Sequence, residues 1–137
     1  HVIVQRVDDL RPVDSLLDLA TMSQFKPVLV TRGTVLARKL DIAGVNLSEV
    51  SSEREALQML TLGRTDAIYG QDVNLIRHIR DARLADRVRL GRTVFQEESQ
   101  YLAVRSDLPQ PTVDRLTDAL RRLERDGVLR LLQEKYR

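Results

Sequence analysis

The stretch between residues 26 and 70 decides the fold. It opens with KPVLVTRGT (residues 26–34) and closes with VSSEREALQMLTLGRTDAIYG (residues 50–70). Short runs rich in β-branched residues predict strands at residues 26–31, 47–50 and 66–69. Apolar spacings of three and four predict helices at residues 34–43 and 52–62, and the second opens with the capping-box sequence Ser52-Glu-Arg-Glu55. This alternation is typical of an α/β protein with a mainly parallel sheet and flanking helices.

The segments on either side extend the same pattern. Before residue 26 we expect a strand at residues 2–4 and a short helix at residues 14–19. After residue 70 we expect a long helix from Gln71 or Asp72, extended segments at 88–94 and 100–104, and helices at 112–125 and 128–136. Residues 106–111 contain two of the four prolines and are predicted to be a linker. The chain is therefore expected to divide into an α/β lobe, residues 1–105, and a C-terminal helix pair, residues 106–137.

The composition favours one globular domain and excludes several classes of site. The chain has 137 residues, of which 42% are apolar and 31% charged, with a formal net charge of +2. A chain of this length buries a core without help from a disulfide or a metal. The absence of Cys excludes thiolate catalysis, Cys-ligated zinc and iron–sulfur clusters. No apolar run has the length of a membrane span, and we expect no cofactor and no metal.

Three strand ends form the candidate site, because ligands of open α/β sheets bind at the carboxyl ends of the strands. The three are Thr31-Arg-Gly-Thr34, Ser51-Ser52 and Gly70-Gln-Asp72. Each leads into a helix N-terminus, where backbone amides favour a negative group. Gly33 would let a ligand approach the backbone, Thr34 adds a hydroxyl, and Arg32 offers a cation to a carboxylate or phosphate. Asp72 could hold an ammonium group, so the two ends together would suit a zwitterion.

A plainer interpretation of these residues stays open. In it Gly33 forms a turn, Thr34 and Asp72 cap helices, and Arg32 is solvated. The candidate ligand-binding residues are Thr31, Arg32, Gly33, Thr34, Gln71 and Asp72.

Other constellations predict chemistry less strongly. His78 lies between arginines in the long helix, and no cluster of His, Asp and Glu has metal-ligand spacing. Ser51-Ser52 has no His nearby in the sequence, so a helix cap is the expected role. Between residues 77 and 92 there are six arginines, four of them at spacings of one helix face: Arg77, Arg80, Arg83 and Arg87. Without an aromatic platform we expect a solvated face there and no nucleic-acid partner.

The chain resembles the bacterial extracellular solute-binding proteins of family 3 in three segments. Two are the segments quoted above, residues 26–34 and 50–70, and the third is the ending ALRRLERDGVLRLLQEKYR (residues 119–137). These proteins are the receptors for polar amino acids and related solutes in ABC importers. They have the type II periplasmic-binding-protein fold, in which a solute is trapped between two α/β lobes joined by a hinge. The resemblance covers nearly the whole chain, and its most specific part is EALQMLTLGRTDA (residues 55–67) followed by the closing helix pair.

The resemblance implies that this chain is the second lobe plus the C-terminal helices, with residues 1–6 and 100–104 as the strands that cross the hinge. The first lobe would lie outside this sequence. The resemblance further implies that the whole protein is periplasmic and is made with a signal peptide. It would take a small polar solute to an ABC transporter permease. The start HVIVQR is not itself a signal peptide.

The resemblance also assigns residues. Gly33 and Thr34 match the family's Gly-Thr turn. By strict spacing the family's acidic residue falls on Gln71, with Asp72 one place later, and Val35 stands where amino-acid binders often carry a small or hydroxyl residue. These departures weigh against an α-amino-acid ligand and leave solute binding as the expected role.

Two alternatives stay open on the same fold. One is a periplasmic sensor module attached to a kinase or a cell-wall enzyme, and the other is an enzyme that dehydrates cyclic acids, although we expect no catalysis. The apolar stripe of the C-terminal helices is also expected to be buried against another surface. One hypothesis is a homodimer formed through these helices. Because trapping needs both lobes, these residues alone should bind a solute weakly.

Overall fold

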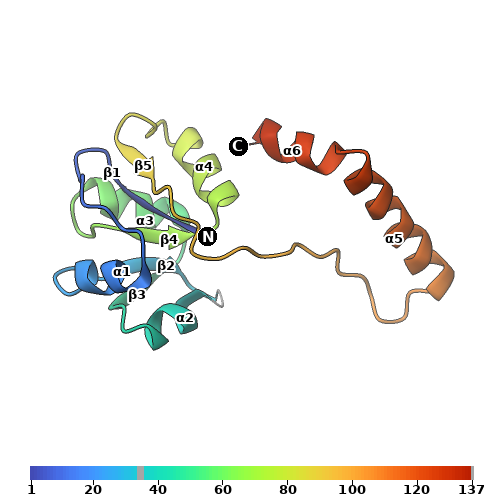
Figure 1. Cartoon of the computed structure of the whole chain (residues 1–137), viewed down its shortest axis with the longest axis horizontal. Helices are drawn as coiled ribbons and strands as arrows, with labels where there is room; N and C mark the ends of the chain where they lie inside the picture. Colours follow the sequence, from blue (N-terminus) through green and yellow to red (C-terminus); the bar gives the residue numbers. More distant parts are fainter. Residues whose placement is uncertain (34–35, 137) are drawn as a thin grey trace. The chain divides into compact units, whose positions relative to one another are not determined.

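The computed structural model describes residues 1–33 and 36–136. The chain forms two compact units, residues 1–97 and residues 98–137 (Figure 1). The first unit contains the sheet and the candidate site. A functional boundary after residue 105 stays a prediction.

A five-stranded sheet with strand order β3-β2-β4-β1-β5 is the centre of the first unit. Its strands are β1 (Val2–Arg6), β2 (Val28–Thr31), β3 (Leu47–Val50), β4 (Ile68–Gly70) and β5 (Val88–Leu90). β2 pairs in parallel with β3 and β4, whereas β1 pairs antiparallel with β4 and β5. Four of these five strands therefore run in one direction and β1 runs against them. The expected α/β fold is confirmed, with a mixed sheet in which two strand pairings are parallel and two are antiparallel.

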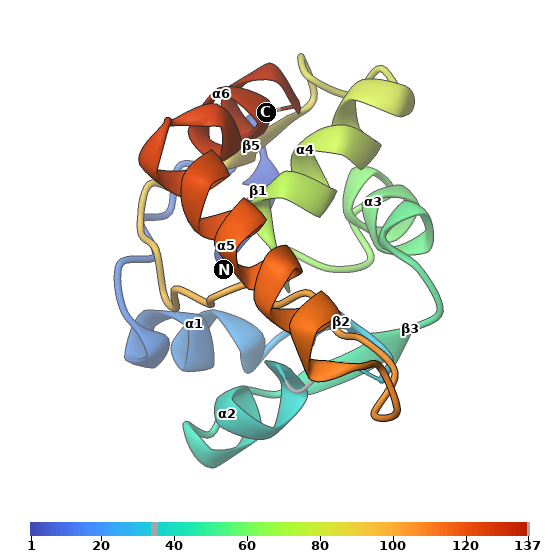
Figure 2. The same cartoon turned by 90° about the vertical axis from the view of Figure 1, so that its right-hand side faces the viewer.

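Helices cover both faces of this sheet because successive strand residues point to opposite sides. On β1, Val2 and Val4 belong to one core cluster and Ile3 to the other. The first cluster includes side chains of α3 (Glu53–Thr61) and α4 (Asp72–Asp81), and the second includes side chains of α1 (Leu16–Ser23) and α2 (Leu36–Ile42). Figure 2 shows the two helix pairs on their separate sides of the strands. The first unit is thus a three-layer α/β/α structure.

The inward face of α4 packs closely on β4. Leu75 and Ile79 are buried, whereas Val73 is 39% exposed. Gly70 gives Leu75 its space, because a Cβ at Gly70 would lie 3.2 Å from Leu75 Cδ1. The side chain of Leu75 therefore packs directly against the end of β4.

Serine caps open two of the helices. Ser15 Oγ accepts from the amide of Asp18 at the start of α1, and Ser52 Oγ accepts from the amide of Glu55 at the start of α3. In a capping box the side chain of Glu55 would also accept from the amide of Ser52. In the structure it bonds to the preceding residue, Ser51, instead. Glu55 Oε2 accepts from the amide and the hydroxyl of Ser51, at 2.9 and 2.6 Å, and not from Ser52.

An ionic cluster lies at the amino edge of the sheet, opposite the candidate site. Asp66, just before β4, accepts from Arg6 Nη2 and Lys26 Nζ, each at 3.2 Å, and its other oxygen lies 3.0 Å from Arg11 Nη2. Burial alone would raise the pKa of Asp66, but hydrogen bonds from Arg11, Lys26 and Arg6 outweigh it and lower the pKa below its ordinary value. This carboxylate therefore joins β1, the loop after it and the starts of β2 and β4.

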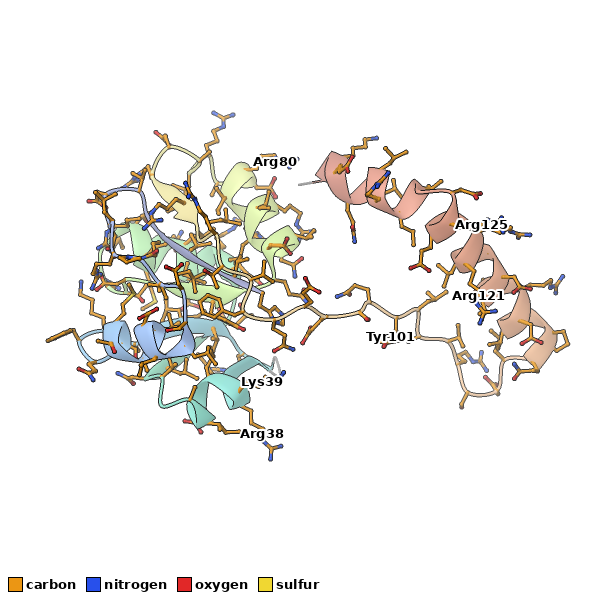
Figure 3. The ribbon with its side chains drawn as sticks, in the orientation of Figure 1. Arg38, Lys39, Arg80, Tyr101, Arg121 and Arg125 are labelled. Atoms are coloured by element: carbon orange, nitrogen blue, oxygen red, sulfur yellow. The ribbon has the colours of Figure 1, made fainter. Side chains whose placement is uncertain are left out.

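The second unit contains a segment without regular structure and two helices, α5 (Gln110–Arg125) and α6 (Val128–Tyr136). Gly127, with φ +72°, forms the predicted break between them. The expected strand at residues 100–104 is absent from the described structure. These residues are exposed, with Tyr101 at 89%, and a strand needs a neighbouring strand to satisfy its backbone. Figure 3 shows Tyr101 on this segment and Arg121 and Arg125 on α5.

Candidate functional site

The carboxyl ends of β2, β3 and β4 meet at one edge of the sheet. Thr31 at the end of β2 pairs with Val50 at the end of β3. Leu29 pairs with Ile68, so two residues later Thr31 lies level with Gly70 at the end of β4. The residues that follow these ends, 31–33, 51–52 and 70–72, are called the rim below. The structure therefore brings together the three strand ends that the sequence singled out.

The turn after β2 gives the rim an open backbone. The amide of Arg32 donates to the carbonyl of Val50 at 2.9 Å, which fixes the start of the turn against β3. Gly33 has φ +78°, which favours glycine, and no heavy atom lies within 4 Å of the position that a Cβ would occupy. The side chain of Arg32 is 72% exposed and its Nε lies 3.7 Å from Glu49 Oε2. Thr34, predicted to add a hydroxyl here, lies outside the described residues.

The end of β3 is occupied by its own helix cap. Ser52 caps α3, and Glu55 accepts from Ser51 as described above. The hydrogen bond from the Ser51 hydroxyl, together with the bond from the Ser51 amide, lowers the pKa of Glu55. The predicted role of Ser51-Ser52 as a cap is confirmed.

The end of β4 brings two candidate residues to the start of α4. Gln71 is the N-cap residue, and its side chain makes no capping hydrogen bond. Instead its Oε1 accepts from Asn74 Nδ2 at 3.0 Å. Asp72 is the first residue of α4, is half-buried and has an interaction partner within the chain. With its oxygen accepting from Asn74, the Gln71 side chain has its NH₂ group as its donor.

The structure adds residues to this edge that sequence reasoning missed. Val2 pairs with Gly70, so His1 lies beside the start of α4. The His1 carbonyl accepts from the amide of Phe95 at 2.9 Å. The ring of Tyr69 lies near both side chains, with its centroid 5.7 Å from that of the His1 ring and 5.8 Å from that of the Phe95 ring. An antiparallel β1 is what places them here, and the sequence pattern did not reveal its direction.

A cation reaches the same edge from α2. Lys39 Nζ donates to Gln96 Oε1 at 2.9 Å, and the main-chain oxygen of Gln96 accepts from the His1 nitrogen. Figure 3 shows Lys39 and Arg38 on α2, with Arg38 pointing away from the sheet. The alternation of a cation with the apolar positions of α2 is a common surface pattern, so no sequence signal marked Lys39.

Other candidate chemistry lies away from the rim. His78 is half-buried, 3.8 Å from Glu53, and it lines a groove of about 250 Å³ between α3 and the carboxyl-terminal part of α4. The predicted arginine face is interrupted, because α4 ends at Asp81 and Arg83 has a left-handed backbone with φ +54°. Among residues 1–33 and 36–136, no group of three His, Asp or Glu side chains could hold a metal ion. Nor does any helix in this part of the chain have the length and apolar character to span a membrane.

Comparison with known proteins supports the fold. No family model matches the sequence, and neither does a curated protein. Three solved structures with this fold are similar to the chain. One is an ancestral amino-acid-binding protein, a precursor of cyclohexadienyl dehydratase, with 20% sequence identity and a TM-score of 0.73. The others are the L-cystine solute receptor of Neisseria gonorrhoeae, with 18% identity and a TM-score of 0.67, and a histidine kinase sensor domain with similarity to periplasmic binding proteins, with 21% identity and a TM-score of 0.68.

These matches extend over 98% of this chain but only over 56%, 54% and 57% of the respective structures. The chain therefore spans a little over half the length of the proteins that it resembles. At these identities the likeness establishes the fold alone. The chain has the fold of one α/β lobe, with C-terminal helices, of the type II periplasmic-binding-protein architecture.

Proposed function

We propose that this chain is one half of a solute-binding protein and that its rim binds a small polar solute without covalent chemistry. The observation that carries the proposal is the gathering of three strand ends at one edge, with the open backbone of Gly33 at the end of β2. Ligands of open α/β sheets bind at such carboxyl ends. The ligand-binding residues we propose are Thr31, Arg32, Gly33, Thr34, Gln71 and Asp72.

A pair of glycine substitutions tests the site. Gly33 and Gly63 have nearly the same backbone, with φ +78° and +72°, and a Cβ meets nothing within 4 Å at either position. Gly33→Ala and Gly63→Ala should therefore cost similar stability, about 1 kcal/mol each, because both force a Cβ into the left-handed region. Gly33→Ala should also weaken solute binding, since the added methyl group covers the backbone at the rim.

The measurement is a titration of the ¹⁵N-labelled chain with a panel of amino acids and organic acids, followed by NMR amide shifts. We expect shifts at Gly33, Ser51 and Gln71, and we expect Gly33→Ala to reduce them while Gly63→Ala leaves them as they are. Equal effects of the two substitutions, or shifts centred on the groove lined by His78, would contradict the proposed site.

Within the cell, we propose the periplasm as the location and the substrate-binding component of an ABC importer as the role, with a permease as partner. The solved structures of an L-cystine solute receptor and an ancestral amino-acid-binding protein support this role. A transporter gene cluster around the gene would favour it.

A sensor role is the second candidate, because a histidine kinase sensor domain has the same fold over 98% of this chain. A kinase encoded downstream in the same gene would decide for the sensor. Catalysis is the third candidate, because the ancestral amino-acid-binding protein with this fold is a precursor of cyclohexadienyl dehydratase. Turnover of a cyclic carboxylic acid that disappears with Asp72→Asn would decide for an enzyme.

The C-terminal helices have an apolar stripe that we propose is covered in the complete protein. Leu116, Leu120 and Leu123 are each 37–39% exposed on α5, and Leu131 on α6 is 61% exposed. A homodimer through this stripe is one such cover. Light scattering of a concentrated solution tests it, and a monomer would end the dimer hypothesis.

A further inference from the structure

The hydrogen-bonding groups of the rim are unequally occupied, and from this we infer the class of solute. The rim takes a solute that presents a carboxylate, or a similar anionic acceptor, to this unit and no ammonium group. Gln71 is the residue that determines this preference. The inference rests on the proposed function and specifies it for the same rim.

The carboxylates at this edge are already engaged within the chain. Glu55 accepts from the amide and the hydroxyl of Ser51. Glu49 lies 3.7 Å from Arg32, and Asp72 has an interaction partner as well. An incoming ammonium group would share these carboxylates with the groups that already interact with them.

The donors at the edge retain capacity. Gln71 gives its oxygen to Asn74, and an amide side chain used in this way presents two N–H hydrogens. Lys39 donates to the neutral oxygen of Gln96 at 2.9 Å, and this contact does not neutralise its charge. Arg32, whose side chain is 72% exposed, adds a second cation, and its ion pair with Glu49 at 3.7 Å offsets part of that charge.

These donors belong to one edge although they come from three segments. Gln96 connects Lys39 to His1, and the pairing of Val2 with Gly70 sets His1 beside Gln71. An anionic acceptor at this edge receives a hydrogen bond from Gln71 and is attracted by Lys39 and Arg32. An ammonium group meets a donor at Gln71 and would share the carboxylates of this edge with their present partners, so the preference follows from the direction of the hydrogen bond at Gln71, with Lys39 and Arg32 adding to it.

A matched pair of probes separates the two cases. Succinate and 1,4-diaminobutane both have four carbons in a chain and carry opposite charges at their ends. The complete ¹⁵N-labelled chain is titrated with each in the millimolar range at constant ionic strength, and the amides of Gly33, Ser51 and Gln71 are followed. We expect succinate to shift these amides and 1,4-diaminobutane to leave them in place.

The isosteric substitution Gln71→Glu replaces the NH₂ donor of this side chain by a negatively charged acceptor. It should weaken succinate binding about tenfold or more, because two like charges then face each other, and it should let 1,4-diaminobutane shift the rim amides. Gln58→Glu is the control, since it makes the same change at an exposed position in α3 away from the rim. It should leave the response to both probes unchanged.

The possible failures are distinguishable. If 1,4-diaminobutane binds the unaltered rim better than succinate, or if Gln71→Glu leaves the preference as it was, the inference is overturned while solute binding at the rim stands. If no member of the wider solute panel shifts the rim amides, the proposed function and the inference fall together. Rim shifts with amino acids but not with succinate would overturn the inference alone.

Discussion

At the residue scale, the two edges of the sheet differ in how their polar groups are used. At the amino edge, Asp66 has a side chain only 9% exposed and three cationic partners: Arg6, Arg11 and Lys26. At the carboxyl edge, Gln71 and Gly33 offer groups to the outside. The sequence marks both edges with short polar insertions between apolar runs, but only the structure shows which polar groups are consumed internally.

Replacing Asp66 should destabilise the fold. Asp66→Asn leaves three cations around a neutral amide, and we expect a loss of about 2–3 kcal/mol in the free energy of unfolding. Asp86→Asn is the matched control, because Asp86 is exposed in the turn before β5. Chemical denaturation should show a clear loss for the first substitution and almost none for the second. Equal stability of the two variants would contradict the structural role of the cluster.

The same carboxylate makes stability depend on pH. The pKa of Asp66 is lowered in the folded chain relative to its ordinary value of 3.8, so its contribution is complete above that value and is lost as the pH falls below it. We therefore expect the free energy of unfolding to decrease from about pH 5 downward, and to decrease less steeply in Asp66→Asn. Unfolding curves across this range measure it. An identical slope in the variant would show that Asp66 is not linked to folding.

At the element scale, caps and turns position the rim. Ser52 begins α3 directly after β3, and Gly33 turns the chain directly after β2, so each helix starts where its strand ends. The positions of β2, β3, β4, α3 and α4 could be predicted because hydrophobic periodicity, Gly63 and the capping sequence agree locally. The direction of β1 and the fate of residues 100–104 could not, because both depend on pairing with distant segments. Lys39 and Phe95 joined the site through that same long-range pairing.

The cap of α3 gives a quantitative test at this scale. Ser52→Ala removes the oxygen that accepts from the amide of Glu55 at 3.2 Å, and we expect a loss of about 1 kcal/mol in the free energy of unfolding. Ser99→Ala, in the exposed segment after the first unit, makes the same chemical change without a cap. Denaturation midpoints should separate the two variants. A stability loss of the same size at Ser99 would contradict the capping role.

At the scale of the whole molecule, the first unit has the layers and core of an α/β lobe, and in the function we propose it provides one wall of a binding site. Both core clusters consist of residues within the first 97, and the rim lies at the edge where four parallel strands end. Sites for small solutes usually bury most of the ligand surface. A single rim covers one side of a solute, so much of the solute would remain in water unless a second wall closes over it.

Calorimetry of these 137 residues with the solutes that shift the rim amides tests this central claim most directly. We predict weak binding, in the millimolar range, because one wall contributes only part of the contacts and no closure traps the solute. Binding at micromolar or tighter affinity would contradict the claim, because it would mean that this chain alone forms a complete site.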